Sequence, residues 1–311
     1  MEIIDDPDFP ENHKSGFVAL VGRPNVGKST LMNAFLQQKI AIVTPRPQTT
    51  RTRQLGIITE PTYQMIFVDT PGIIQNARHK LDEFMIETAV DTLNDADVIL
   101  WLIDSAVRPG PMDQAIAKML AETSDDASVV IGMNKSDQLT PDKVIPHTEA
   151  YQRLVPDAQW LLFSAQEGHG VPELLQMLAD ALPDGPRFYP EDQITDIFVR
   201  DIAAELIREQ VFLQLTDELP YSIAVKVLEF KERPNGTTYI SANIFVERDN
   251  HKKILIGKKG SRLRQLGAAA RKEIEKLVDG KVFLELWVKV EPKWRRRENV
   301  LKRFGYSDPD A

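Results

Sequence analysis

The sequence contains no cysteine, no long apolar run and no apolar segment at its N-terminus. The absence of cysteine among 311 residues excludes a disulfide framework and a thiolate metal site, and it indicates a reducing compartment. No stretch reaches the roughly 18 consecutive apolar residues of a membrane span. Residues 1–14 are acidic and polar, unlike a signal peptide. We therefore expect a cytoplasmic protein.

The chain also lacks a positive overall charge, since its formal net charge of −8 by itself argues against a nucleic-acid partner. The charge is unevenly distributed, however. Residues 226–303 hold 21 Lys and Arg against 10 Asp and Glu, a net +11, which leaves −19 for the rest. Such asymmetry indicates a nucleic-acid-binding module joined to a domain of different purpose.

A phosphate-binding loop is the most specific feature that is present. An apolar run leads into the loop and an apolar helical pattern follows, which is the context that this motif requires. The loop reads Gly22-Arg23-Pro24-Asn25-Val26-Gly27-Lys28-Ser29-Thr30. We expect Lys28 to bridge the β- and γ-phosphates and Ser29 to bind Mg²⁺. The alternative is a glycine-rich turn that binds nothing.

Three further polar motifs each follow a predicted strand. They are Asp69-Thr70-Pro71-Gly72, Asn134-Lys135-Ser136-Asp137 and Ser164-Ala165-Gln166. Strands alternate with helices in this half, which predicts a doubly wound α/β domain with its ligands beyond the carboxyl ends of the strands. We expect Asp69 to hold Mg²⁺ and the Gly72 N–H to approach the γ-phosphate.

The motif at residues 134–137 selects the base. The Asp137 carboxylate can accept two hydrogen bonds from guanine, whereas adenine offers it no donors. A buried carboxylate left without partners costs on the order of a few kcal/mol, which favours GTP over ATP. Residues 164–166 are expected to support guanine from the other side.

The second half has a different pattern of elements. A polar, proline-containing linker at residues 184–196 leads into a helix, two strands, a short helix, a glycine-rich turn, a longer helix and a strand. The turn, Gly257-Lys258-Lys259-Gly260, lets backbone and lysines approach phosphates. The predicted RNA-binding residues are Ile256, Gly257, Lys258, Lys259, Gly260, Arg262, Lys252, Lys253, Lys293, Arg295 and Arg296, with Arg264 and Arg297 extending the patch. A solvated basic face is the alternative.

In order, these motifs resemble those of translation-factor-related GTPases, and Gln48-Thr49-Thr50-Arg51 resembles the switch of the TrmE-Era-EngA group. The second half resembles a type II KH domain. One such GTPase domain followed by one such KH domain is the architecture of the Era family, of which the chain is identified as a member over about residues 16–303. The fold expected is therefore a doubly wound P-loop GTPase domain followed by a smaller α+β KH domain.

We divide the chain accordingly into five segments. They are a flexible leader (1–14), a GTP-binding domain (15–183), a linker (184–196), a KH domain with a basic tail (197–303) and a terminal tail (304–311).

The resemblance implies the activity and the partners. It implies a Mg²⁺-dependent GTPase that binds the 3′ end of 16S ribosomal RNA, acts on the 30S particle in small-subunit maturation, and associates in part with the inner face of the membrane. We expect a monomer. The basic tail suits lipid headgroups as well as RNA.

The chain departs from the simplest GTPases at one position. A Gln that orients the attacking water in Ras-like enzymes is replaced by Ile73, so slow hydrolysis is expected. We hypothesise that K⁺ held by Asn25 stimulates turnover, the alternative being that Asn25 only shapes the loop. Of Thr49 and Thr50, the group pattern favours Thr50 as the Mg²⁺ ligand. The expected catalytic residues are thus Lys28, Thr50, Gly72 and Asn25.

Two rival functions are weighed against this one. The first is an ATP-using P-loop kinase or ATPase, which the base motif at residues 134–137 disfavours. The second is an RNA-binding KH protein whose nucleotide domain is structural or weakly active, which the intact Lys28, Ser29 and Asp69 disfavour.

Overall fold

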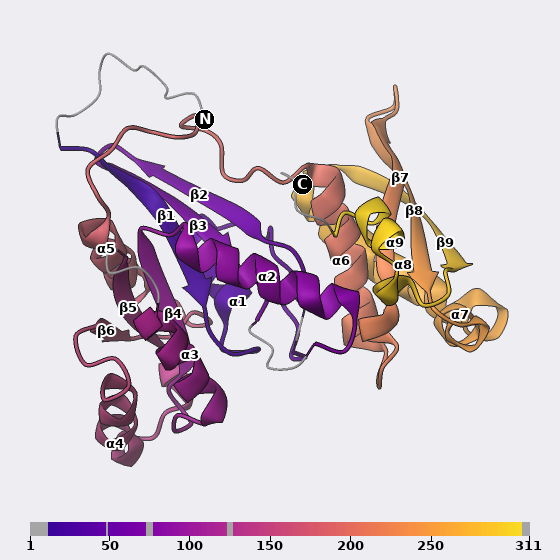
Figure 1. The fold of residues 1–311 in the computed structure, drawn as a ribbon. Coiled ribbons are helices and arrows are strands. Elements are labelled where there is room, and N and C mark those ends of the chain that lie inside the picture. The colour runs from indigo at the N-terminus through magenta and orange to yellow at the C-terminus, as the bar shows by residue number, and fades with distance from the viewer. Residues whose placement is uncertain (1–11, 48, 73–76, 123–126, 307–311) are drawn as a thin grey trace. The chain divides into compact units, whose positions relative to one another are not determined.

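The computed structural model describes residues 12–47, 49–72, 77–122 and 127–306, which form two compact units (Figure 1). Unit 1 falls within residues 1–38, 50–76 and 85–196, and unit 2 within residues 39–49, 77–84 and 197–311. The division therefore does not follow the order of the chain. Two short segments from the first half belong to the unit formed by the second half.

Unit 1 is built on a six-stranded sheet in the order β2-β3-β1-β4-β5-β6. Strands β2 and β3 are antiparallel, and all other neighbours are parallel. The strands are β1 (Lys14–Val21), β2 (Gln54–Glu60), β3 (Tyr63–Asp69), β4 (Val98–Asp104), β5 (Ser128–Asn134) and β6 (Gln159–Leu162). The helices are α1 (Lys28–Leu36), α2 (Lys80–Asn94), α3 (Pro111–Glu122), α4 (Pro141–Gln152) and α5 (Val171–Ala181). The start of α2, residues 80–84, belongs to unit 2. This is the doubly wound architecture that the sequence predicts.

Helices cover both faces of this sheet. The central strand β4 is buried throughout residues 98–103, as its apolar sequence predicts. On one face Trp101 shares a core cluster with Ile116 of α3. On the other, Phe35 of α1 stacks on Phe67 of β3 with ring centroids 4.7 Å apart. The loops at the carboxyl ends of the strands are left to form a site.

The segment predicted as a linker, residues 184–196, lies along unit 1. Gln64, fully buried in β3, accepts a hydrogen bond from the Tyr189 N–H at 2.9 Å and donates one to the Tyr189 carbonyl at 2.8 Å. The Ile57 N–H of edge strand β2 donates to the Ile194 carbonyl at 2.8 Å. The segment thereby pairs with an otherwise open sheet edge, and its path is fixed by hydrogen bonds.

Unit 2 contains a three-stranded sheet in the order β7-β8-β9. Strands β7 (Ala224–Glu232) and β8 (Thr237–Val246) are antiparallel, and β8 is parallel to β9 (Lys281–Val290). The helices are α6 (Val199–Gln214), α7 (Asp249–Ile256), α8 (Ser261–Leu277) and α9 (Glu298–Arg303). Helix α6 packs on α8 and β7, and α8 packs on β9. The order of elements agrees with the predicted α+β domain.

The basic tail of the second half is folded. Trp294 is fully buried, and its Nε1–H donates to the Ser222 carbonyl at 2.8 Å. Its ring also stacks on Tyr306, with centroids 5.8 Å apart, and Val300 and Leu301 of α9 are buried. Residues 294–306 therefore complete the core of unit 2. The apolar side chains of this segment, interspersed among its basic ones, cause the burial.

Candidate functional site

The phosphate loop connects β1 to α1, and two of its residues must be glycine. Gly22 and Gly27 have φ of 154° and 106°. A Cβ on Gly22 would lie 2.3 Å from the Leu102 carbonyl oxygen, and one on Gly27 would lie 2.2 Å from Asn134 Nδ2. Neither position accepts a side chain, because the loop passes directly against the ends of β4 and β5.

The Lys28 ammonium is enclosed by this loop. Its side chain is buried, and Nζ donates to the carbonyl oxygens of Gly22 and Arg23 at 3.1 and 3.3 Å. Burial lowers the pKa of Lys28, and the nearby Asp69 carboxylate opposes this effect. A phosphate group beside the loop favours the charged form further, since an anion offsets the cost of desolvation.

The three predicted metal ligands come together from different elements. Ser29 lies in the first turn of α1, Thr50 precedes β2, and Asp69 ends β3. Ser29 Oγ donates to Asp69 Oδ2 at 2.7 Å, and Thr50 Oγ1 lies 3.2 Å from Ser29 Oγ and 3.4 Å from Asp69 Oδ2. All the donor atoms are oxygen, which is the ligand type that Mg²⁺ prefers.

Asp69 itself carries a second indication of a cation. Its side chain is fully buried, and Oδ1 has no hydrogen-bond partner within the described part of the chain. Burial raises the pKa of Asp69, while Lys28 and the two hydroxyls oppose this rise. A buried carboxylate oxygen without a partner is costly unless a cation or water meets it. The residues present therefore fit Mg²⁺.

Asn134, at the end of β5, joins the base motif to the phosphate loop. Its Nδ2 donates to the Val26 carbonyl at 2.8 Å, and its Oδ1 accepts from the Ala165 N–H at 2.9 Å. One buried amide thus fixes the phosphate loop and the last motif in a single arrangement. The sequence predicts nucleotide binding for Asn134 but does not indicate this bridging contact.

The carboxylate predicted to recognise guanine is held in a fixed orientation. Asp137 lies in a 3₁₀ turn (Ser136–Gln138) and is exposed, and its Oδ1 accepts a hydrogen bond from Ser164 Oγ at 2.6 Å. Lys135, which has a φ of 65°, pairs with Asp104 at 2.7 Å. Gln166, two residues after Ser164, is exposed. The base motif is therefore held on both sides by hydrogen bonds.

The third motif follows β3 directly. Thr70 Oγ1 donates to the Leu20 carbonyl at 3.0 Å, and a Cβ on Gly72 would lie 3.1 Å from Pro24 Cγ. Ile73 lies outside the described residues. Asn25 adopts a φ of 64°, a conformation that Asn tolerates better than most residues. Its predicted K⁺ role stays a prediction.

Sequence reasoning missed the anchor of Arg23. The Arg23 Nε–H donates to Asp113 Oδ1 at 2.7 Å, and Asp113 is fully buried in the first turn of α3. The other carboxylate oxygen accepts from the Gly110 N–H at 2.8 Å. Tyr151 of α4 lies near this pair. Burial, and then the Asp113 carboxylate, raise the pKa of the Tyr151 hydroxyl to about 12. An acidic residue at a helix start is too common a signal to predict this contact.

The glycine-rich turn of unit 2 lies between α7 and α8. Gly257 and Gly260 have φ of 71° and 76°, and Lys259 has a φ of 50°. Both lysines of the turn are exposed. Because a Cβ on Gly257 would lie 2.8 Å from Arg262 Cβ, the turn requires glycine there. The turn has two glycines without side chains, so phosphates can approach its backbone, and it carries two exposed ammonium groups. This combination is suited to binding phosphates.

A groove of about 390 Å³ lies beside this turn, between α8 and β9. Its lining residues are Gly260, Leu263, Arg264, Gly267, Ala268, Arg271, Phe283, Leu284 and Leu286. Of these residues, the sequence predicts only Gly260 and Arg264 to bind RNA. The small residues at positions 267 and 268, one helical turn from Arg264 and Arg271, are the signal that indicates an open helix face.

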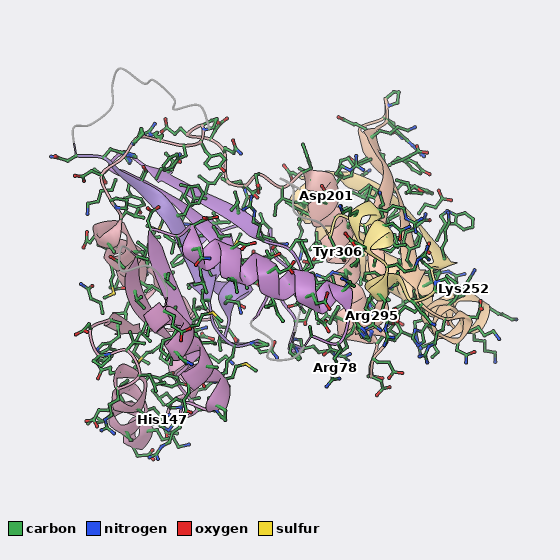
Figure 2. All side chains as sticks on the ribbon, viewed as in Figure 1. Arg78, His147, Asp201, Lys252, Arg295 and Tyr306 are labelled. Atoms are coloured by element: carbon green, nitrogen blue, oxygen red, sulfur yellow. The ribbon has the colours of Figure 1, made fainter. Side chains whose placement is uncertain are left out.

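Lys252 and Arg295, two of the other predicted RNA-binding residues, are labelled in Figure 2. Lys252 and Lys253 lie on α7, and Lys293 is exposed. Four of the arginines already have partners. Arg262 donates to the Ile254 carbonyl at 3.0 Å and Arg296 to His79 Nδ1 at 3.4 Å. Arg295 pairs with Glu247 at 2.6 Å and Arg297 with Glu291 at 2.7 Å. These residues are thus partly committed to internal contacts.

Comparisons with known proteins agree with a GTPase domain followed by a KH domain. Residues 17–135 match a family described as 50S ribosome-binding GTPase, and residues 218–295 match the KH domain family. GTPase Era of Halothermothrix orenii is 45% identical over 95% of this chain and 99% of its own length. GTPase Era of Lactobacillus delbrueckii is 47% identical over 94% of this chain and 96% of its own.

Two solved structures are similar over 95% of this chain and the whole of theirs. One is an Era variant of Aquifex aeolicus bound to GDP and AlF₄⁻, with a TM-score of 0.90 and 39% identity. The other is Era in complex with MgGDPNP and nucleotides 1506–1542 of 16S ribosomal RNA, with a TM-score of 0.90 and 40% identity. The fold predicted from the sequence and the resemblance on which it rests are both confirmed.

Proposed function

The chain belongs to the GTPase Era family, and from that premise we propose that it is a GTP-hydrolysing switch that binds the 3′ end of 16S ribosomal RNA in small-subunit assembly. The observation that carries the proposal is the convergence of Ser29, Thr50 and Asp69 within 3.4 Å of one another beside Lys28. A structural nucleotide domain has no need of this arrangement. The RNA partner is supported by the similar Era that holds this RNA.

The nucleotide is bound by complementary charge and by backbone donors. Lys28 places an ammonium group at the β- and γ-phosphates, and the first turn of α1 directs its N–H groups at the same place. Asp137 accepts hydrogen bonds from guanine, with Ser164 fixing the carboxylate. Asn134 keeps the base and phosphate sites in register, since it bonds to both loops.

Mg²⁺ would be held by Ser29 and Thr50, with Asp69 contributing through its buried carboxylate. When bound, Mg²⁺ neutralises charge that develops on the phosphate oxygens. Thr50 connects this site to the segment before β2, and Gly72 connects it to the loop after β3. Loops held in this way change conformation when the γ-phosphate leaves. The chain's own residues thereby convert hydrolysis into a structural signal.

Hydrolysis by this chain is expected to be slow, because Ile73 cannot orient the attacking water. We propose that a K⁺ ion near Asn25 supplies the charge that assists it. The test is GTP turnover in K⁺ and in Na⁺ at matched ionic strength, with Asn25→Ala as the variant. Faster turnover in K⁺ that Asn25→Ala removes supports the proposal, and equal rates contradict it.

RNA binding is assigned to unit 2. Lys258 and Lys259 are exposed in the turn at residues 257–260, and the groove between α8 and β9 opens beside it. Phosphates are expected at the turn and unpaired bases along the groove. The direction proposed is that the GTP form binds RNA and that hydrolysis releases it.

The cellular setting completes the proposal. No helix in the part of the chain that the structure describes is long and apolar enough to cross a bilayer. We propose a cytoplasmic monomer that acts on the 30S particle, with peripheral contact to the inner face of the membrane through basic residues of unit 2. Flotation with vesicles of anionic and neutral lipids checks the membrane contact, since binding to neither would contradict it.

The test of the enzymatic core is competition and turnover. The full chain should bind a fluorescent GDP analogue with Mg²⁺, lose it to GTP but not to ATP, and release phosphate slowly. Lys28→Ala should abolish turnover without unfolding the protein. GTP turnover that survives Lys28→Ala, or displacement by ATP as effective as by GTP, would contradict the proposal.

A further inference from the structure

Helix α6 carries two charged side chains that are almost completely buried. Arg208 and Glu209 are each 1% exposed. Charged side chains are seldom buried in this way unless they have partners. The partners of these two therefore indicate what α6 holds.

Glu209 holds the first half of residues 39–49, the segment of unit 2 that directly precedes Thr50. Glu209 Oε2 pairs with Lys39 Nζ at 2.7 Å, and Oε1 accepts from the Val43 N–H at 2.9 Å. Lys39 Nζ also lies 3.2 Å from Glu273 Oε2 on α8, the helix that begins after Gly260. The start of the segment is thus joined to two helices of unit 2.

Arg208 holds the end of the same segment. Its Nη2 donates to the Thr49 carbonyl and to Glu205 on the preceding turn of α6. Glu205 is partly exposed, so it orients the guanidinium from the solvent side. One helix therefore binds a backbone N–H near the start of the segment and a backbone carbonyl at its end.

This arrangement specifies a conformation more than it adds stability. A buried ion pair contributes little net free energy, because desolvation of the two charges offsets their attraction. Apolar side chains at positions 208 and 209 would pack α6 equally well, but they could not bond to the segment's backbone. The charges on Arg208 and Glu209 therefore serve to hold the backbone of the segment in one position.

We propose that Arg208 is a positioning residue for Thr50, and that Glu209 holds the same segment at its other end. The Thr49 carbonyl belongs to the planar peptide group that joins Thr49 to Thr50, so fixing its oxygen restricts the backbone of Thr50. The Thr50 hydroxyl lies 3.2 Å from Ser29 Oγ and 3.4 Å from Asp69 Oδ2. The inference rests on the Mg²⁺ role proposed for Thr50 and deepens it.

The test uses the full chain with two readouts. The first is amide hydrogen exchange of peptides that cover residues 39–50, measured with GDP and Mg²⁺. The second is the Mg²⁺ concentration that half-maximally slows release of a fluorescent, non-hydrolysable GTP analogue. The variants are Arg208→Met, Arg208→Lys, Glu209→Gln and Thr50→Ala. Ile207→Val is the control, since Ile207 is a buried apolar neighbour on the same helix.

Arg208→Met should accelerate exchange near residue 49 and raise the Mg²⁺ midpoint, each by about tenfold, the effect of losing one charged hydrogen bond. Arg208→Lys should restore part of both, and Glu209→Gln should accelerate exchange near residues 39–43. Thr50→Ala should raise the Mg²⁺ midpoint without accelerating exchange at residues 39–47. Ile207→Val should change neither readout.

A thermal melt of each variant checks folding. If Arg208→Met does not fold, Arg208→Lys and Glu209→Gln provide the test.

Two results distinguish a failure of the positioning role of Arg208 from a failure of the Mg²⁺ role of Thr50. If Thr50→Ala raises the Mg²⁺ midpoint while Arg208→Met leaves both readouts unchanged, the positioning role of Arg208 is overturned. If Thr50→Ala leaves the midpoint unchanged, the Mg²⁺ role of Thr50 is overturned, and the positioning of a metal ligand by Arg208 with it. Exchange near residue 49 in Arg208→Met then shows only whether Arg208 holds the segment.

Discussion

At the scale of single residues, the nucleotide site depends on contacts too close to accept an added Cβ atom. Gly27 and Asn134 are 107 positions apart in the chain, yet a Cβ on Gly27 would lie 2.2 Å from the Asn134 amide nitrogen. The same amide fixes the Val26 carbonyl and the Ala165 N–H. The phosphate and base motifs therefore form one structure.

Gly27→Ala is predicted to reduce GTP affinity by at least about 100-fold. The added Cβ would displace Asn134, and alanine is strained at the φ of 106° that residue 27 adopts. Titration of a fluorescent GTP analogue measures the loss. Gly110→Ala is the matched control, since its Cβ would lie 3.8 Å from the nearest atom, Asp113 Oδ2. Equal affinity in the two variants would show that the loop tolerates the side chain.

Asp137→Asn is predicted to reduce GTP affinity by roughly 100-fold, because an amide cannot accept both guanine donors and places a donor against one of them. Ser164 Oγ can still donate to the new side-chain oxygen, so the fold should persist. Competition between GTP and ATP measures the effect. An unchanged preference for GTP would move base recognition to another residue.

Much of this detail could be predicted from the sequence, because the motifs are local and their order is specific. Lys28, Ser29, Thr50 and Asp69, which lie close together in the structure, were all named from such motifs. Asp113 and Arg208 could not be found in this way, since each acts on a residue 90 or more positions away through tertiary packing alone. No local pattern records such a pairing.

At the scale of elements, the strands and helices follow the hydrophobic pattern closely. The apolar run at residues 98–103 became the buried central strand, and the hairpin signal at residues 234–236 joins β7 to β8. The structure of segments without a hydrophobic pattern could not be predicted in this way. Residues 184–196 are polar, and nothing in them alone indicates that a buried glutamine two strands away fixes their path.

Gln64→Leu is predicted to lower the free energy of unfolding of the full chain by about 2–4 kcal/mol. The change leaves the backbone groups that Gln64 bonds, among them both polar groups of Tyr189, without partners. Chemical unfolding followed by circular dichroism measures the loss. Gln176→Leu, at an exposed position on α5, should change the value by no more than about 0.5 kcal/mol. A similarly small effect for Gln64→Leu would mean that the segment is not held there.

At the scale of the whole molecule, the uneven charge separates two tasks. The acidic majority of the chain holds the nucleotide site, and the net +11 of residues 226–303 accompanies the glycine-rich turn and its groove. This division was visible in the sequence, because charge counts need no structure. The membership of residues 39–49 and 77–84 in unit 2 was not, since contacts between distant segments decide it.

The salt dependence of RNA binding is predicted to follow from this charge. Each phosphate contact contributes a slope of about −0.7 to log affinity against log salt for single-stranded RNA. Lys258→Ala with Lys259→Ala should therefore make the slope less steep by about 1.4, twice that value. Lys143→Ala, an exposed lysine of unit 1, is the control and should leave it unchanged. An unaltered slope in the double variant would place the phosphate contacts elsewhere.

The central claim is that one chain couples a GTP site to an RNA site. The most direct measurement is the affinity of the full chain for the 3′ end of 16S ribosomal RNA, with GDP and with a non-hydrolysable GTP analogue, for the native protein and for Lys258→Glu with Lys259→Glu. The account predicts tighter binding in the GTP form, and loss of that binding in the charge-reversed protein. Affinity that is indifferent to both the nucleotide and the two lysines would contradict it.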